Sequence, residues 1–226
     1  MRRIVPIVVL GALLLASDSA SQQHAQHSRL FKAEDLGILE GPDRDVWQRP
    51  DQIMDALGIA EGSVVAELGV AGGWFTIRLA RRVGPNGTVY AEDIQATMLD
   101  VIKRRLPREN LNNVKTVLGA ADDPKLPEKV DAIVIVDAYH EMDQPIAMLR
   151  SAAGALKDDG RLGIVEFTLA GGGPGPPMDE RLDPERVIRE ANAADLVLVA
   201  RPNFLRYQYM LVFGKKAASP AARPPR

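Results

Sequence analysis

The stretch at residues 64–76 reads VVAELGVAGGWFT and decides the fold. It opens with an apolar run typical of a buried strand, passes through small residues, and continues into an amphipathic helix. Small residues let a backbone approach a ligand closely, and the N-terminus of a helix presents free N–H groups. The pattern therefore predicts a strand–turn–helix unit that cradles a nucleotide-like ligand. The spacing of Gly69, Ala71 and Gly73 differs from the G-x-G-x-x-G of dinucleotide-binding folds.

Strand and helix patterns alternate through the middle of the chain. This alternation predicts an α/β fold with a seven-stranded sheet, parallel except for a last antiparallel pair, and helices on both faces. The expected strands are residues 63–68, 88–92, 114–118, 130–136 and 161–167, followed by the pair 196–200 and 207–213. The expected helices are residues 44–57, 73–83, 95–106, 143–156 and 184–192, with Asp143 as the cap of the fourth and Pro145 in its first turn.

Four acidic residues fall at the carboxyl ends of the first four expected strands: Glu67, Asp93, Asp122 and Asp137. Ligands of open α/β sheets bind outside these ends. The acids are therefore expected to converge on one site. Side chains alternate along a strand, so the alternation alone favours neither Glu92 nor Asp93 as the residue that faces a ligand.

The spacing Glu67-x-Gly69-x-Ala71-x-Gly73 resembles motif I of class I S-adenosylmethionine (SAM) dependent methyltransferases. The similarity extends over residues 43–214, to a bacterial group of often exported methyltransferases with a Rossmann-like sheet. Ala71 is a departure, because the motif usually has Gly there. The other matching segments are WQRPD at 47–51, VYAEDIQ at 89–95, DDPKLP at 122–127 and VDAYHEM at 136–142.

The resemblance implies SAM as the cofactor and assigns roles around it. Glu67 takes the methionine end, Asp93 takes the ribose hydroxyls, and Asp122 or Asp123 bonds the adenine amino group. The implied cofactor-binding set is Glu67, Gly69, Ala71, Gly73, Asp93, Ile94, Asp122 and Asp137.

Tyr139, His140 and Glu141 have acid–base capacity and are the candidate catalytic residues. His140 can take a proton from a nucleophilic acceptor, with Glu141 orienting it and Tyr139 lining the pocket. Alternatively, His140 and Glu141 satisfy backbone groups at the start of the next helix. Methyl transfer to a good nucleophile needs mainly alignment, so a base is not required. No metal site is expected, because no acid or Cys completes a set with His24 and His27.

The composition is that of one globular domain. The chain has 226 residues, of which 46% are hydrophobic and 26% charged. A net charge of −2 favours a small-molecule acceptor over nucleic acid. The chain has no cysteine, which excludes disulfides and a Cys nucleophile. Oligomeric state does not follow from these features.

The N-terminus has the pattern of an export signal. Arg2 and Arg3 precede an apolar run at residues 4–16 and then small residues. Residues 1–20 are expected to be a signal peptide, so that the protein is periplasmic or secreted; the alternative is an uncleaved membrane anchor. The run is shorter than the about 20 residues of a stable membrane span. Residues 21–42 are expected to be a linker, 43–214 the catalytic domain, and 215–226 a disordered tail.

The expected function is methyl transfer from SAM to an unidentified acceptor. Two alternatives remain open from the sequence. One is an exported protein with a SAM-binding fold that binds ligands without catalysis. The other is an α/β enzyme with another nucleotide cofactor, such as a nicotinamide oxidoreductase.

Overall fold

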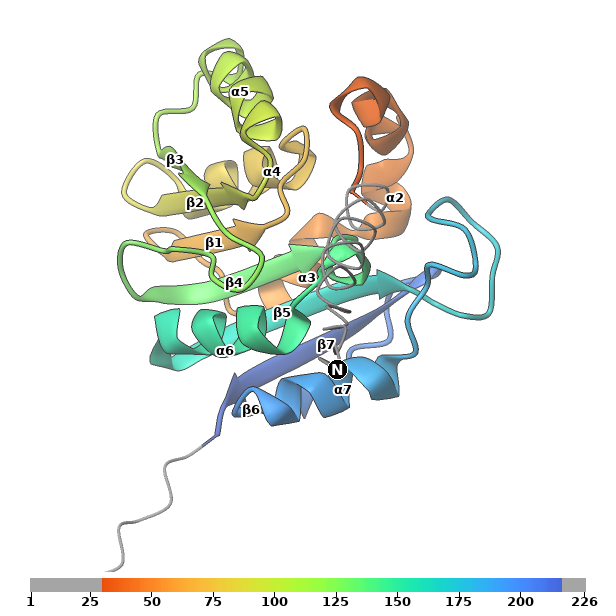
Figure 1. Ribbon diagram of the computed structural model, residues 1–226. Coiled ribbons are helices and arrows are strands. Elements are labelled where there is room, and N and C mark those ends of the chain that lie inside the picture. Colours follow the sequence, from red (N-terminus) through yellow and green to blue (C-terminus); the bar gives the residue numbers. More distant parts are fainter. Residues whose placement is uncertain (1–29, 217–226) are drawn as a thin grey trace, which may run out of the picture. The chain divides into compact units, whose positions relative to one another are not determined.

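The computed structural model describes residues 30–216, so the expected signal peptide and residues 217–226 of the expected tail lie outside the described part. Its sheet has seven strands in the order β3-β2-β1-β4-β5-β7-β6 (Figure 1). The first five are parallel, and β7 runs antiparallel to both β5 and β6. The predicted fold class is confirmed. The strands are β1 Val64–Leu68, β2 Thr88–Asp93, β3 Val114–Leu118, β4 Val130–Val136, β5 Leu156–Phe167, β6 Leu196–Ala200 and β7 Gln208–Lys215.

Helices cover both faces of the sheet. α3, α4 and α5 pack on one face, and α6 and α7 pack on the other (Figure 1). None of the described helices is long and apolar enough to span a bilayer. The α-helices are α2 Arg44–Gln48, α3 Pro50–Ala56, α4 Trp74–Val83, α5 Ala96–Arg105, α6 Pro145–Ala155 and α7 Pro184–Ala193. The 3-10 helices are η1 Ala33–Glu40, η2 Leu106–Glu109 and η3 Tyr139–Glu141.

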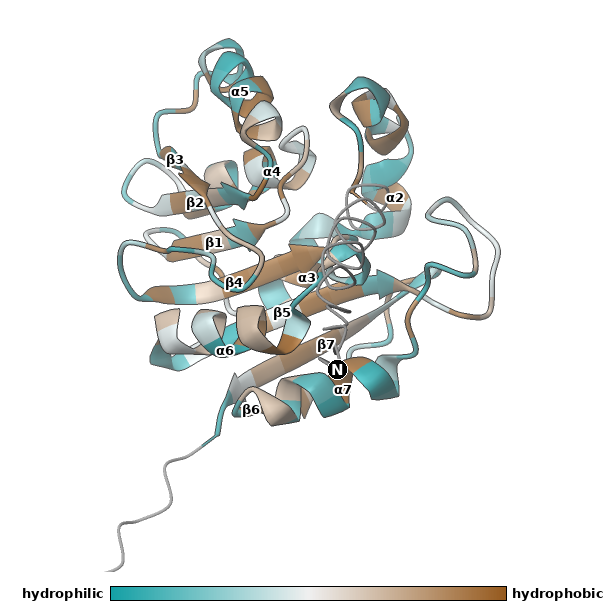
Figure 2. Cartoon of the chain, in the orientation of Figure 1, coloured by the Kyte–Doolittle hydropathy of each residue, from teal (hydrophilic) through white to brown (hydrophobic). Residues whose placement is uncertain are grey.

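The core lies on both sides of the central strand β4. Ile133 and Ile135 belong to the cluster under α6 and α7, whereas Val134 belongs to the cluster under α3 and α4. All three side chains are fully buried. A strand covered on both faces is apolar throughout, and Figure 2 shows β4 in brown along most of its length. Burial of each such side chain contributes about 1.5–3 kcal/mol to stability. The site described below lies at the carboxyl end of this strand.

Three expectations about the elements were wrong. The helix expected at residues 44–57 is broken at Arg49, which has φ 50, because Pro50 disfavours a helical conformation of the residue before it. The cap of α6 is Gln144, with no side-chain bond, and not Asp143. Strand β5 begins at Leu156, so the turn expected at residues 158–160 is an irregularity within the strand.

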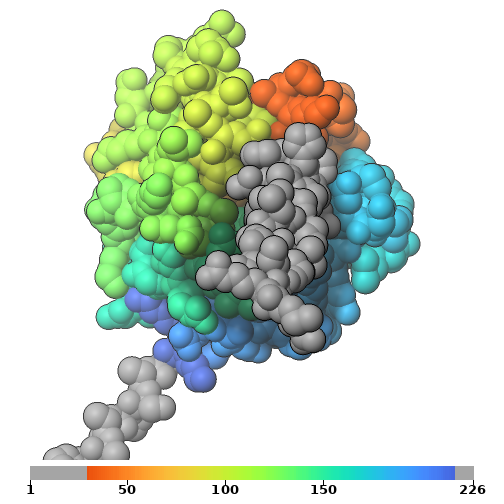
Figure 3. Space-filling view, viewed as in Figure 1, coloured from red at the N-terminus to blue at the C-terminus, as the bar shows by residue number. Residues whose placement is uncertain are grey.

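The described part of the expected linker contains η1. Arg44 Nη1 donates a hydrogen bond of 2.5 Å to the carbonyl of Leu39 at the end of this helix. Leu36 and Leu39 of η1 line the pocket described below. In the space-filling view, the N-terminal part of the described chain (orange-red) and the loop after β5 (cyan-blue) both lie on the viewed face (Figure 3).

Candidate functional site

The turn between β1 and α4 is packed against the turn that follows β4. Gly69 has φ +77, and a Cβ built on it would lie 2.6 Å from Cβ of Ala138. Gly73 has φ +82, and its Cβ would lie 3.1 Å from Cγ1 of Ile102 in α5. The glycines predicted from motif spacing thus allow close approaches within the chain itself. Ala71, between them, has φ 45, a left-handed conformation that is unfavourable for a residue with a side chain.

A pocket lies at the carboxyl ends of β1 and β4. Of the predicted cofactor-binding residues, Glu67, Gly69, Ala71 and Asp137 line it. Gly73, Asp93, Ile94 and Asp122 do not belong to its lining. The remaining lining residues come mainly from η1, α2 and the start of α4: Leu36, Leu39, Glu40, Arg44, Trp74 and Phe75.

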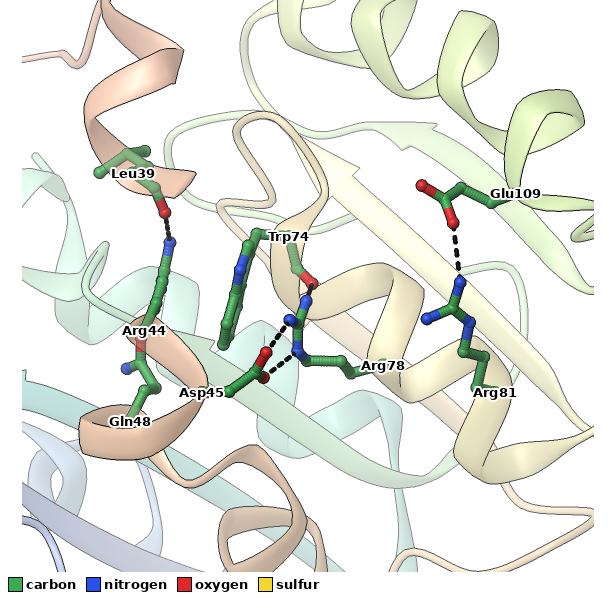
Figure 4. A network of polar contacts seen from close by, with 8 residues as sticks. All are labelled: Leu39, Arg44, Asp45, Gln48, Trp74, Arg78, Arg81 and Glu109. Atoms are coloured by element: carbon green, nitrogen blue, oxygen red, sulfur yellow. Dashed lines mark hydrogen bonds and ion pairs between the residues drawn. The ribbon is translucent and has the colours of Figure 1, made fainter. Parts of the chain in front are cut away.

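The indole of Trp74 lies between two guanidinium groups (Figure 4). The Arg44 Cζ lies 4.2 Å from the ring centroid and the Arg78 Cζ lies 3.5 Å from it. Arg78 is also held by two hydrogen bonds of 2.6 Å to Asp45. Stacking on opposite faces of the indole therefore holds both guanidinium groups in place. Of the two arginines, only Arg44 lines the pocket.

Arg44 is a pocket residue that the sequence analysis missed. Its side chain is buried, and Nε donates 2.7 Å to Oε1 of Gln48. Gln48 Nε2 in turn donates 2.9 Å to Oε1 of Gln208 on β7. The charge of Arg44 acts on the carboxyls of Glu67 and Asp137. Nothing in the sequence distinguishes a buried arginine of a short helix from a solvated one, except its place just before the WQRPD segment.

Glu67 is a buried carboxyl next to this cation. Thr76 Oγ1 donates a hydrogen bond of 2.5 Å to its Oε2. Burial raises the pKa of Glu67 to about 8, and the bond from Thr76 and the charge of Arg44 offset this only partly. A buried carboxyl in this state gains from a cationic ligand group, which would favour its ionised form.

The two acids at the end of β2 have different surroundings. Asp93 accepts hydrogen bonds from the backbone N–H of Gln95 at 2.8 Å and of Ala71 at 3.1 Å. It thus links the segment after β2 to the turn between β1 and α4. Glu92 alternates to the other face, against Gly119, and its Oε1 is buried without a partner among the described residues. Burial raises the pKa of Glu92 to about 8.

Two other predicted cofactor-binding residues, Ile94 and Asp122, are exposed and lie outside the pocket lining. Ile94 is 38% exposed at the start of the loop after β2. Asp122 is exposed. Its neighbour Asp123 accepts hydrogen bonds from the N–H of Lys125 and from Ser151 Oγ, at 2.9 and 2.7 Å, and so anchors its own loop.

Glu166 near the end of β5 organises the candidate catalytic segment and was not predicted. It is fully buried, and its Oε1 accepts hydrogen bonds from the backbone N–H of Tyr139 at 2.7 Å and of His140 at 3.2 Å. Its Oε2 lies 3.0 Å from Nδ1 of His140. The expected partner, Glu141, instead accepts from the N–H of Phe31 at 3.1 Å. Tyr139 is buried, and its hydroxyl donates 2.8 Å to Glu190 of α7.

His140 and Asp137 are electrostatically linked through Glu166. Burial alone would lower the pKa of His140, but the hydrogen bond and charge of Glu166, with the charges of Asp137 and Glu141, raise it to about 9. Burial, and then the charge of Glu166, raise the pKa of Asp137 to about 7. His140 thus favours the imidazolium at neutral pH, which is the form that donates a proton rather than accepts one. Asp137, His140 and Glu166 are also close enough together to hold a metal ion.

Comparison with known proteins supplies the context of this geometry. A family model described as "Methyltransferase domain" matches residues 65–160. The ubiquinone/menaquinone biosynthesis C-methyltransferase UbiE of Pasteurella multocida is 32% identical over 125 residues, which are 54% of this chain and 46% of that protein. The chain thus spans about half the length of the curated relatives it matches.

Solved structures share the fold. A SAM-dependent methyltransferase from Aquifex aeolicus superposes with a TM-score of 0.76 at 22% identity, covering 81% of this chain and 98% of that one. The [4+2]-cyclase SpnF superposes with a TM-score of 0.63 at 14% identity, covering 76% of this chain and 81% of that one. The architecture alone is therefore compatible with more than one reaction.

Proposed function

Because the chain belongs to the class I SAM-dependent methyltransferase family, we propose that it transfers a methyl group from SAM to a small organic acceptor. The observation that carries the proposal is the pairing of Arg44 with Glu67 in one pocket, beside the turn from β1 to α4. A pocket that sets a buried cation beside a buried carboxyl complements a zwitterion. The methionine end of SAM is such a group.

The residues of the pocket fit the two charged groups of that end. Arg44 uses Nε and Nη1 for Gln48 and Leu39, and no hydrogen bond within residues 30–216 involves its Nη2. This nitrogen is the donor we assign to the carboxylate of SAM, in the manner of charge-assisted bonds. Glu67 is the acceptor that we assign to the ammonium, which would stabilise the ionised form of a carboxyl now disfavoured by burial.

When bound, SAM supplies an activated methyl donor, so the chain has to align the acceptor and exclude water. We infer that His140 contributes to alignment rather than acting as a general base. Glu166 fixes the imidazole ring, and the raised pKa keeps a proton on it at neutral pH. The imidazolium can donate a hydrogen bond to an acceptor oxygen and orient it toward the methyl group.

The acceptor class is an extension of the proposal. The UbiE relatives are named as C-methyltransferases of quinone biosynthesis. A net charge of −2 is also more suitable for a small organic acceptor than for nucleic acid.

We further propose that the protein is exported, on the basis of residues 1–20. Fractionation of the native cells, with mass spectrometry of the N-terminus, tests the export; an intact Met1 on cytoplasmic protein would contradict it.

Calorimetry on the full chain tests the cofactor. We expect S-adenosylhomocysteine to bind in the micromolar range, about −8 kcal/mol, and NAD not to bind. Arg44→Gln should weaken binding about 10- to 100-fold, the loss of about 1.5–3 kcal/mol from a charged hydrogen bond. Arg78→Gln is the matched control, because Arg78 stacks on the same indole but bonds Asp45 instead of lining the pocket; it should change the affinity less than about threefold.

The outcomes separate the alternatives. No heat with millimolar S-adenosylhomocysteine and a folded chain would refute the SAM site, and binding of NAD instead would support the nicotinamide alternative. Binding without methyl transfer from labelled SAM to any compound in a panel of phenols, hydroquinones and amines would favour a binding protein.

A further inference from the structure

We propose that Asp137, His140 and Glu166 form a site for one divalent cation. Two segments supply the three residues: Asp137 and His140 lie in the segment after β4, and Glu166 lies near the end of β5. The fold brings one donor atom of each within 4.8 Å of the others. This inference goes beyond methyl transfer and does not depend on it.

The distances suit a single ion. Metal–ligand bonds to N and O are about 2.0–2.4 Å, so neighbouring ligands lie about 3 Å apart and opposite ones about 4–5 Å apart. His140 Nδ1 and Glu166 Oε2 are separated by 3.0 Å, the spacing of neighbouring ligands. The donor atom of Asp137 lies within 4.8 Å of the other two, which is inside the span of opposite ligands.

Asp137 provides the independent observation. Its Oδ1 is enclosed, and no hydrogen bond within residues 30–216 reaches either of its carboxylate oxygens. Asp137 as a whole is partly buried, but an enclosed carboxylate oxygen without partners is unfavourable, because it has lost its water. Asp93 at the end of β2 shows the usual solution, where both carboxylate oxygens accept backbone N–H groups. A cation would satisfy Asp137 in the way that backbone groups satisfy Asp93.

Glu166 is held in position for coordination. Its Oε1 is fixed by the backbone N–H groups of Tyr139 and His140, which leaves Oε2 for the ion. Supporting bonds of this kind orient the carboxylates of metal sites. At His140, the proton on Nδ1 and the ion are alternatives, since a metal-bound imidazole nitrogen carries no proton. The hydrogen bond between His140 and Glu166 is then the ion-free state of the site.

The donor set selects the kind of ion. Two carboxylates suit Mg²⁺, Ca²⁺ and Mn²⁺, while an imidazole favours the transition metals, so Mn²⁺ satisfies both preferences. Three protein ligands leave positions for water or for an oxygen of a bound molecule. Glu141, whose oxygen lies 4.0 Å from Nε2 of His140, adds negative charge beside the site but is bonded to the N–H of Phe31.

Mn²⁺ titration of the full chain, stripped with EDTA, tests the site by calorimetry and by electron paramagnetic resonance. We expect one Mn²⁺ per chain, displaced by Zn²⁺ and poorly by Mg²⁺. Asp137→Asn should weaken Mn²⁺ binding at least about tenfold, because it removes an anionic ligand with little change of shape. Glu141→Gln is the matched control, since it removes a neighbouring charge but no ligand, and should change the affinity less than about threefold.

Two outcomes would overturn the proposal. One is the absence of Mn²⁺ and Zn²⁺ binding at millimolar metal by a wild-type chain that unfolds cooperatively. The other is an equal loss of affinity in Glu141→Gln and Asp137→Asn, which would indicate general attraction of cations to an acidic surface. S-adenosylhomocysteine binding to the EDTA-stripped wild-type chain is measured in parallel, so that failure of the metal site and failure of the cofactor site are separate results.

Discussion

Gly69→Ala probes the contact that holds the β1 turn against the β4 turn. The new Cβ would lie 2.6 Å from Cβ of Ala138, about 1 Å inside ordinary carbon–carbon contact. Relief of such overpacking costs about 1–3 kcal/mol. The residue also has φ +77, where a side chain costs about 1–2 kcal/mol. We therefore expect Gly69→Ala to lower the free energy of unfolding by about 2–5 kcal/mol, measured by urea denaturation.

Gly62→Ala separates the two contributions. Gly62 has φ +82, nearly the same backbone conformation, but a Cβ there would meet nothing within 4 Å. It should cost only the conformational part, about 1–2 kcal/mol. Ala138→Gly should recover most of the difference in a double-mutant cycle with Gly69→Ala. Equal losses at both glycines, or no coupling with Ala138, would refute the packing argument.

Three further changes test the site edge. Ala71→Gly should raise the free energy of unfolding by about 0.5–1 kcal/mol, because relief of about 1–2 kcal/mol at φ 45 exceeds the entropic cost of glycine; a loss measured by urea denaturation would contradict the strain. Glu92→Gln should have the same free energy of unfolding as the wild type below pH 4.5 and a higher one as the pH rises toward 8. The reason is that the pKa of folded Glu92 is raised to about 8, so the folded residue stays protonated while the unfolded residue ionises. The wild type therefore loses about 1.4 kcal/mol per pH unit in this range. A pH-independent difference would contradict that shift. Asp93→Ala should weaken S-adenosylhomocysteine by about 1.5–3 kcal/mol in calorimetry while Glu92→Gln leaves it unchanged, and the reverse result would exchange the roles of the two acids.

The positions of most strands along the chain were predictable because buried parallel strands leave a simple pattern. The bounds of β3 and β4 coincide with the predicted residues 114–118 and 130–136. Features set by tertiary contacts were less accessible. The conformation of Arg49 is one case, since a helical pattern continued through it. The 3-10 helix η1 is another, because it is held by a bond from Arg44 and buries none of its own side chains fully.

The same division applies to the candidate site. Glu67 and Asp137 were predictable as pocket residues, because strand ends converge whatever the intervening sequence. Arg44 and Glu166 act across long sequence separations, so motif spacing does not reveal them. Glu166 did leave a signal in the sequence. It is the one acid in the apolar run at residues 162–167, the last part of β5, where a buried carboxylate requires partners. His140 was assigned to Glu141 because the two are adjacent in sequence, whereas the fold places Glu166 against its ring.

The stacked position of Trp74 makes the chain its own optical reporter. The protein has two tryptophans. Trp47 packs against Phe167 and Tyr207, at centroid distances of 5.8 and 6.5 Å, and Trp74 lines the pocket with Arg44 on one side of its ring. A molecule that engages the guanidinium of Arg44 alters the field across the indole. The emission of Trp74 therefore reads out occupancy of the pocket without any label, and Trp47→Phe isolates that emission.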